Sequence, residues 1–350
     1  MEAEYIQGKN GIVLEKVIIP YHVKDSEDTL HLRYIEFRKD PLTGLYTRVQ
    51  PFKKKYNINK SKYLFINNST KPENCPFCKS NLKSFLRYSV DDRFKFDRKT
   101  LGRSLIFVAE QLYAKYHAIV IPNTEKHIES IENLSIYDFF NTFNLIRDFV
   151  NVNYSKDKTA KYVYVNLNHT LFAGASERHI HFQVEQNFIP TNYHKIVLER
   201  SQEYFRQNRT SLLEDYIATE VEIGDRDIFS GKFIDWVANF SPYGDYDVIG
   251  FVKSFGIFTM SEINFKQFLE ELFEFILKYI ETTKNIAFNL SIIDTSYIKE
   301  PGIYPMIRIL SRIPNKSGMT SLGYSDVIHL ESLSRTLPEE CAQIIRKAYE

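Results

Sequence analysis

The sequence predicts an α+β fold made of two copies of one structural unit. The unit consists of a strand, a connector, a long amphipathic helix and a following strand, and it occurs twice along the 350 residues. The first helix begins after Ser135, and the second carries an apolar stripe over residues 268–279. Because internal repetition constrains a fold strongly, we predict two repeats joined into one compact protein, an N-terminal repeat over residues 1–235 and a C-terminal repeat over residues 236–350.

Composition excludes several classes of protein. The chain is 43% hydrophobic and 15% aromatic, which is ample for a sizeable core. Its 45 Lys and Arg residues against 44 Asp and Glu residues leave a formal charge of +1, without the basic excess that nucleic-acid binders usually show. The first ten residues contain no apolar signal segment, and no window reaches the roughly 18 uninterrupted apolar residues that a membrane helix needs. We therefore expect a cytoplasmic protein with neither nucleic acid nor membrane as a partner.

The region before the first helix is predicted to consist of strands joined by polar turns. Residues 1–35 contain short apolar runs typical of strands around Pro20. Pro41 and Gly44 are then placed for a turn. Two further strands are predicted before the first helix, at residues 105–108 and 117–121.

Each long helix is followed by a predicted strand. Ser135 opens the first helix, whose apolar stripe contains Ile136, Phe139, Phe140, Phe143, Ile146 and Val150. Residues 162–165 form the next strand, and a polar helix over about 195–208 comes later. The second unit has its strands at residues 248–252 and 286–292, on either side of its long helix. Few Gly or Pro residues separate the two units, so we expect them to pack tightly.

The most informative stretch, residues 166–183, joins a loop of small residues to two histidines and a glutamine. The loop is 173–176, and the spacing of two puts His179, His181 and Gln183 on one face of an extended segment. The alternate side chains would then face a core. Two imidazoles and an amide beside such a loop are typical of a site that handles phosphate. The simpler alternative is a half-buried strand with a solvated polar face.

The second unit and the cysteines indicate where in the chain a catalytic or metal site is expected. The end of the second unit, residues 304–309, contains no histidine, so we expect the chemistry in the first repeat. Cys75 and Cys78 form a C-x-x-C pair, which in a reducing compartment indicates metal or redox chemistry. Cys341 is predicted to be a small packed hydrophobe in the last helix.

Several segments together resemble the galactose-1-phosphate uridylyltransferases, a branch of the histidine-triad superfamily built from two such repeats. The likeness covers most of residues 36–350, and the order of the motifs together with the repeat carries it. The matching segments are Arg38–Gly44, the Cys75 and Cys78 pair, His127 with the connector to Leu134, residues 166–183, the inter-repeat residues 203–216 and 240–243, and the tail from Gly323.

The resemblance implies a nucleotidyltransferase in which His181 is the nucleophile. It would attack the α-phosphorus of a nucleotide sugar or related nucleotide and form a covalent nucleotidyl-histidine, which a phosphate-bearing acceptor then discharges. Imidazole suits this task because it is neutral near pH 7. By the same resemblance, Ser176 and Gln183 donate hydrogen bonds to phosphate oxygens. The resemblance also implies substrate-binding positions at Asn168, Gly174 and Ala175.

The resemblance further implies a structural zinc site with the ligands Cys75, Cys78, His127 and His179. Two thiolates and two imidazoles form a closed tetrahedral site. Its expected purpose is to hold the loop that carries His181. His117 competes with His127 as a ligand, and its simpler interpretation is a core histidine at the start of a strand.

The chain departs from the uridylyltransferase pattern at positions that contact phosphate and sugar. Lys53 stands where the family has a phosphate-binding arginine, and Ala175 stands where it usually has a cysteine. Ser325, followed by Asp326, replaces a hexose-binding glutamate. The histidines of the family's second metal site have no counterpart. These departures leave nucleotidyl transfer through His181 in place and remove the basis for a galactose substrate.

Two alternatives to transfer between sugar phosphates stay open. One is a phosphorylase that uses inorganic phosphate to split a nucleotide sugar or a dinucleoside polyphosphate. The other is a nucleotide-binding module without catalysis, against which the intact set of His179, His181 and Gln183 argues. In the family, residues of a partner chain complete the active site, so the resemblance also implies a homodimer. The abundant Tyr and Phe residues are types that interfaces favour.

Overall fold

The structure is a computed structural model that describes residues 2–24, 29–51, 72–82, 98–109, 112–312 and 324–350. No helix in these ranges is long and apolar enough to cross a membrane. The strands are β1 (Glu2–Gln7), β2 (Val13–Lys24), β3 (Leu30–Lys39), β4 (Tyr46–Val49), β5 (Arg98–Leu101), β6 (Ser104–Val108), β7 (Tyr116–Ile121), β8 (Tyr162–His169), β9 (Phe182–Asn187), β10 (Asp227–Ser230), β11 (Ile234–Ala238), β12 (Asp245–Val252), β13 (Phe288–Asp294), β14 (Met306–Ser311) and β15 (Leu333–Ser334). The helices are α3 (Ile136–Lys156), α4 (Asn192–Asn208), α5 (Leu212–Ile223), α6 (Glu262–Thr283), α7 (Tyr324–Val327) and α8 (Pro338–Arg346), with short 3-10 turns at Lys9–Gly11, Pro72–Asn74, Ile131–Asn133 and Leu171–Ala173.

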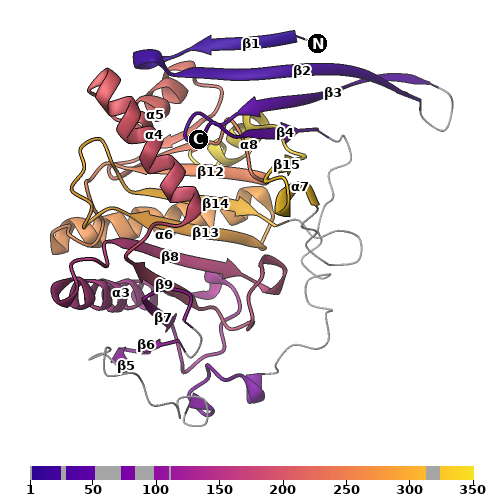
Figure 1. The fold of residues 1–350 in the computed structure, drawn as a ribbon. Coiled ribbons are helices and arrows are strands. Elements are labelled where there is room, and N and C mark those ends of the chain that lie inside the picture. The colour runs from indigo at the N-terminus through magenta and orange to yellow at the C-terminus, as the bar shows by residue number, and fades with distance from the viewer. Residues whose placement is uncertain (1, 25–28, 52–71, 83–97, 110–111, 313–323) are drawn as a thin grey trace.

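The larger sheet displays the predicted repeat in its strand order, β10-β11-β12-β14-β13-β8-β9-β7-β6-β5. In each half a hairpin leads into a long helix and then a second hairpin. The last strand of that hairpin pairs back with the strand before the helix, β9 with β7 and β14 with β12. The halves meet where β8 and β13 pair antiparallel (Figure 1). The predicted α+β fold of two antiparallel repeats, each with a long packed helix, is therefore confirmed.

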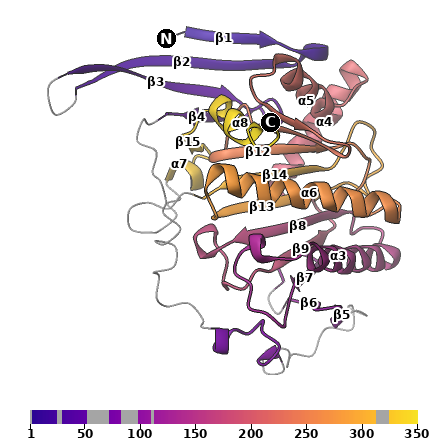
Figure 2. The same ribbon diagram turned by 180° about the vertical axis from the view of Figure 1, so that it is seen from behind.

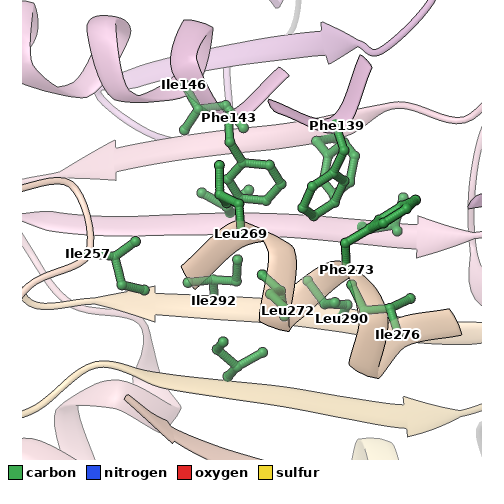
Figure 3. Close-up of a cluster of buried hydrophobic side chains, with 14 of the residues drawn as sticks. Phe139, Phe143, Ile146, Ile257, Leu269, Leu272, Phe273, Ile276, Leu290 and Ile292 are labelled. Carbon is green, nitrogen blue, oxygen red and sulfur yellow. The ribbon is translucent and has the colours of Figure 1, made fainter. Parts of the chain in front are cut away.

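The two long helices cover one face of this sheet, as Figure 2 shows. Each begins at a serine N-cap, because Ser135 accepts the backbone N–H of Asp138 and Ser261 accepts that of Asn264. Their apolar stripes meet over the sheet, and the rings of Phe139 and Phe273 lie 4.8 Å apart (Figure 3). Each fully buried side chain of this size contributes roughly 2–3 kcal/mol. The core thus ties the two repeats together across the β8–β13 seam.

Helices α4 and α5 cover part of the opposite face. The side chains beneath them include Tyr164, Ile249 and Ile293, which belong to a second apolar cluster. Farther along the same strands, toward the end of β8 and the start of β13, this face carries polar side chains of intermediate exposure, among them Asn168 and Asn289. A strip of polar side chains on β8, β9 and β13 is therefore left beyond the part of the sheet that these helices cover.

The smaller sheet has the order β1-β2-β3-β4-β15 and joins the two ends of the chain, because β15 pairs with β4. The strands predicted around Pro20 form one strand, β2, in which Pro20 lies opposite Tyr34. Strand β1 covers only residues 13–18 of β2. On the other side of the hairpin, β4 covers only residues 36–39 of β3. The far end of the β2–β3 hairpin extends beyond the body of the protein (Figure 1).

A buried ion cluster anchors this sheet to the body. The Arg38 guanidinium forms two bonds to the Glu339 carboxylate, at 2.9 and 3.0 Å, and Arg226 binds the same carboxylate at 2.8 Å. Both guanidinium groups lie over the Phe240 ring, at 5.1 and 5.2 Å from its centre. Burial alone would raise the pKa of Glu339, but the two arginines lower it to about 2. The cluster therefore connects β3, the residue before β10, and α8 through one shared carboxylate.

Candidate active site and metal site

The four predicted metal ligands come together in the first repeat. The ligand atoms of Cys75, Cys78, His127 and His179 all lie within 4.8 Å of one another. Cys75 Sγ lies 3.5 Å from His179 Nδ1, and Cys78 Sγ lies 3.5 Å from His127 Nδ1. A tetrahedral metal with such ligands separates a sulfur from a nitrogen by about 3.5 Å. The cluster therefore fits a tetrahedral metal ion.

Hydrogen bonds orient both histidines of this cluster toward a metal. His179 Nε2–H donates to the backbone oxygen of Asn123 at 2.8 Å, and His127 Nε2–H donates to Glu129 Oε1 at 3.1 Å. Each bond places the proton on Nε2, so the Nδ1 lone pair points into the cluster. Burial, with Cys75 adding to the effect, raises the pKa of the Cys78 thiol to about 11. A divalent cation supplies the charge that two adjacent thiolates need.

His181 lies immediately before β9 and is buried. Its Nδ1–H donates to the backbone oxygen of His179 at 2.9 Å, which leaves the Nε2 lone pair available. Burial lowers the pKa of the His181 imidazole, so the ring is neutral near pH 7. Neighbouring Ile180 and Phe182 lie in the main core, as the alternating pattern predicts. The alternative of a solvated polar strand face is wrong for His179 and His181, because both are buried.

The turn that carries Cys75 and Cys78 contacts the ring of His181 directly. Phe77 lies between Cys75 and Cys78 in the sequence, and its ring centre is 5.0 Å from that of His181 in an edge-to-face arrangement. The same ring lies 6.3 Å from His179. A metal that orders this turn would therefore also fix the orientation of the His181 imidazole.

The amide of Gln183 is oriented by His117. The backbone N–H of Tyr113 donates to His117 Nδ1 at 3.3 Å, so the ring carries its proton on Nε2. That Nε2–H then donates to Gln183 Oε1 at 3.2 Å. The oxygen of the amide is therefore occupied, and its NH2 group is the end that can donate to a ligand. His117 lies with Gln183, whereas His127 lies with the cysteines.

The small-residue loop is held from the sheet beneath it. Asn168 Nδ2 donates to the backbone oxygen of Gly174 at 3.3 Å, and Asn289 contacts both Asn168 and the backbone of Ala173. Gly174 adopts a φ of +94°, a left-handed conformation that glycine accommodates readily. No local sequence signal identifies Asn289, because its place in the site comes from the pairing of β8 with β13.

The remaining predicted site residues are two in this loop, two in α7 and one outside the described residues. Ser176 is exposed, and Ala175 is of intermediate exposure. Ser325 and Asp326 lie in α7, on the side of the molecule where β8 ends and β13 begins (Figure 1). Lys53 lies outside the described residues.

Known proteins are similar to this chain in sequence and in fold. No family model matches the sequence. An uncharacterized protein of Archaeoglobus fulgidus is 27% identical over 320 residues, which cover 90% of this chain and 92% of that protein.

Solved structures give a closer comparison of the fold. A GalT-like protein from Arabidopsis thaliana superposes with a TM-score of 0.67 at 14% identity, over 89% of this chain and 98% of that chain. An ADP-glucose phosphorylase from the same plant, with bound ADP-glucose, gives 0.67 at 14% identity over 89% and 99%. A uridylyltransferase mutant gives 0.62 at 14% identity over 89% and 98%. This chain therefore has the fold of the GalT-like proteins, as the motifs predicted.

Proposed function

We propose that this chain, with its GalT-like fold, is a nucleotidyltransferase that carries a nucleoside monophosphate on His181. The observation that supports this most directly is the hydrogen bond from His181 Nδ1–H to the oxygen of His179, which leaves Nε2 as a free nucleophile on a neutral ring. The catalytic machinery lies in residues 1–235, and residues 236–350 form the second repeat without catalytic histidines.

The reaction would proceed in two displacements at one phosphorus atom. His181 Nε2 forms a bond to the α-phosphorus of a nucleotide sugar while the bond from that phosphorus to the bridging oxygen breaks. The sugar phosphate leaves with the electron pair of that bond. An oxygen of the acceptor phosphate then attacks the same phosphorus and the Nε2–P bond breaks, which restores the neutral imidazole.

The neighbouring polar groups would stabilise the charge that develops on the phosphate oxygens. The NH2 group of Gln183 is the free end of an amide whose oxygen is held by His117. The exposed Ser176 hydroxyl and the loop residues Gly174 and Ala175 border the same segment. Lys53 would add a positive charge at the position where relatives carry an arginine. Preorganised donors of this kind are typically worth ten- to a thousandfold in rate each.

The metal of the cluster is proposed to be zinc, bound by Cys75, Cys78, His127 and His179. Two thiolates and two imidazoles at tetrahedral spacing are a ligand set that zinc prefers in closed structural sites. Zinc would hold the turn that packs Phe77 against His181. One zinc ion per chain should therefore co-purify with the protein. In Cys75→Ser both the metal content and the melting temperature should fall. Metal analysis that finds none, together with full stability in chelator, contradicts the assignment.

The acceptor distinguishes the two forms of this proposal. In the first form the acceptor is a sugar phosphate, and in the second it is inorganic phosphate, so that the enzyme is a phosphorylase. The second form is supported by Ser325 and Asp326, which stand where the uridylyltransferases have a hexose-binding glutamate. One solved neighbour is an ADP-glucose phosphorylase.

A substrate screen tests the proposal and separates its two forms. ADP-glucose and UDP-glucose serve as donors, each with inorganic phosphate or with hexose 1-phosphates, and products are separated by chromatography. Release of a nucleoside diphosphate with inorganic phosphate supports the phosphorylase. A new nucleotide sugar with a hexose 1-phosphate supports the transferase. Failure of every donor to react with metal-loaded protein contradicts the proposed function.

A homodimer is proposed as the active assembly. Residues 19–24 and 30–35 pair only with each other among the described parts of the sheet, and a free two-stranded ribbon is marginally stable in water. Its exposed apolar side chains are Val23, Leu30, Leu32 and Tyr34. A second exposed apolar segment begins at the last residue of α7 and contains Val327, Ile328 and Leu330. A second copy of the chain would cover these side chains.

Hybrid dimers test whether the partner contributes to the site. Chains with His181→Ala are mixed with chains that carry Ser325→Ala and Asp326→Ala, each inactive or impaired alone. If α7 serves the partner's site, the mixture regains part of the activity. A stable, fully active monomer in sedimentation at assay concentrations contradicts the dimer.

We also propose a cytoplasmic location, which the unpaired thiols of the cysteine cluster support.

A further inference from the structure

Asn289 of the second repeat binds the loop of the first repeat. It lies on β13 directly opposite Asn168 of β8, in the seam between the repeats. Its Nδ2 group donates to Asn168 Oδ1 at 2.7 Å and to the backbone oxygen of Ala173 at 2.8 Å. One side-chain amide thus donates one hydrogen to β8 and the other to the loop.

The orientation of these amides is fixed by their partners. A backbone oxygen can only accept, so the atom of Asn289 that faces Ala173 must be the nitrogen. Asn168 then presents its oxygen to Asn289, and its own nitrogen is directed to the backbone oxygen of Gly174. Asn289 on β13 therefore binds the carbonyl group of Ala173 directly. It also orients Asn168 on β8, which binds the next carbonyl group, that of Gly174.

The loop needs such support because its backbone is strained. Thr170, which precedes the turn and is not a glycine, has a φ of +79°. Such conformations persist where the surrounding structure over-determines them. Inside the loop, the oxygen of Thr170 accepts the N–H groups of Ala173 at 3.0 Å and Ala175 at 3.3 Å. Hydrogen bonds from Asn289 and Asn168 connect this turn to the sheet.

We propose that Asn289 is a positioning residue for nucleotidyl transfer, supplied by the repeat that lacks catalytic histidines. The inference rests on the proposed function and deepens it. Asn289 acts through Asn168 and the loop and does not itself contact the reacting phosphate. Without its two donors, the oxygens of Asn168 and Ala173 lose a partner and the loop relaxes. A displacement of about 1 Å at a phosphate site can cost roughly a hundredfold in rate.

The first experiment compares Asn289→Ala and Asn289→Asp with a matched control. Asn289→Asp keeps the shape and removes both donors. The control is Ser291→Ala on the same strand face, because the Ser291 hydroxyl binds Asn166 at 2.8 Å and not the loop. The readout is the single-turnover rate of protein labelling by α-phosphorus-labelled ADP-glucose or UDP-glucose. Both Asn289 variants should be slowed by about ten- to a hundredfold, and the control by less than about threefold.

A double-mutant cycle separates positioning from a general structural effect. Ser176→Ala removes a side-chain donor of the loop. If Asn289 acts by placing the loop, Asn289→Ala should slow the Ser176→Ala protein by much less than it slows the wild type. Fully additive effects, or equal slowing by Ser291→Ala, overturn the proposal. Melting temperatures of all variants show whether each is folded.

Amide hydrogen exchange decides the inference without any activity. In Asn289→Ala and Asn289→Asp the amides of residues 173–175 should exchange faster than in wild type, whereas in Ser291→Ala they should not. Unchanged exchange in both Asn289 variants overturns the inference even if transfer is observed. Absence of labelling in wild-type protein, with faster loop exchange in the variants, overturns the proposed function and leaves the positioning of the loop supported.

Discussion

The two repeats place equivalent residues in one row across the larger sheet and use them differently. Gln183, Asn166, Ser291 and Arg308 are successive cross-strand neighbours on β9, β8, β13 and β14. Gln183 and Arg308 therefore occupy matching positions on either side of the seam. Each has a partner on the next strand of its own half. That partner is His117 for Gln183.

In the second repeat the partner is Asp247. Arg308 forms a two-pronged ion pair with the Asp247 carboxylate, and the rings of Tyr193 and Tyr243 lie over its guanidinium at 5.3 and 4.0 Å. Asp247 is buried and 10% of the Arg308 side chain is exposed, so aromatic rings and an ion pair enclose most of this guanidinium, whereas Gln183 is of intermediate exposure. Under the proposed function, this position binds the ligand in the first repeat, whereas in the second repeat aromatic side chains cover it and it contributes to stability.

The largest effect on turnover is expected from a change at His181, a histidine that the second repeat lacks. His181→Ala removes the nucleophile, so turnover with every donor and acceptor pair should be lost while the protein keeps its metal and its cooperative unfolding. Chromatographic assay of products checks this. Activity in His181→Ala above about one thousandth of the wild-type level would mean that another group forms the covalent bond.

A smaller loss is expected from the phosphate-binding donors. Gln183→Ala and Ser176→Ala should each slow transfer by roughly ten- to a thousandfold, because a preorganised donor is lost while the nucleophile remains. Gln183→Glu is a useful companion, since its carboxylate can still accept from His117 but cannot donate to phosphate. If Gln183→Glu retained the wild-type rate, the amide would have no part in binding phosphate.

The smallest effect on chemistry is expected at the matching pair of the second repeat. Asp247→Asn leaves the Arg308 charge buried without its counter-charge, which should lower the free energy of unfolding by about 3–5 kcal/mol. The rate of nucleotidyl transfer per folded molecule should stay at the wild-type level. Denaturant unfolding and single-turnover labelling measure the two quantities separately. A large fall in rate at unchanged stability would place the second repeat in the chemistry.

The repeat and the helix start at Ser135 could be predicted because their signals are local, whereas the full set of four metal ligands was implied by the resemblance to the uridylyltransferases. Ser135 precedes an apolar stripe, and the spacing of Cys75 from Cys78 and of His179 from His181 is visible in the sequence. Their geometry follows from helix period, strand period and metal-ligand chemistry.

The contacts that hold the site could not be predicted, because they depend on register between distant strands. Asn289 reaches Asn168 only because β13 pairs with β8 in one particular alignment. Arg38 and Glu339, which are 301 residues apart, meet only after both ends of the chain have packed on the same body. Polar residues of this kind look in a sequence like solvated surface positions.

The most direct test of the account is the mass of the intact protein after mixing with ADP-glucose or UDP-glucose in the absence of an acceptor. The account predicts an added mass of one nucleoside monophosphate. After digestion under conditions that preserve phosphoramidates, the modification should lie on His181. It should disappear when the acceptor is added and be absent from His181→Ala. An adduct on another residue, or catalytic turnover with no adduct at any time, would contradict transfer through His181.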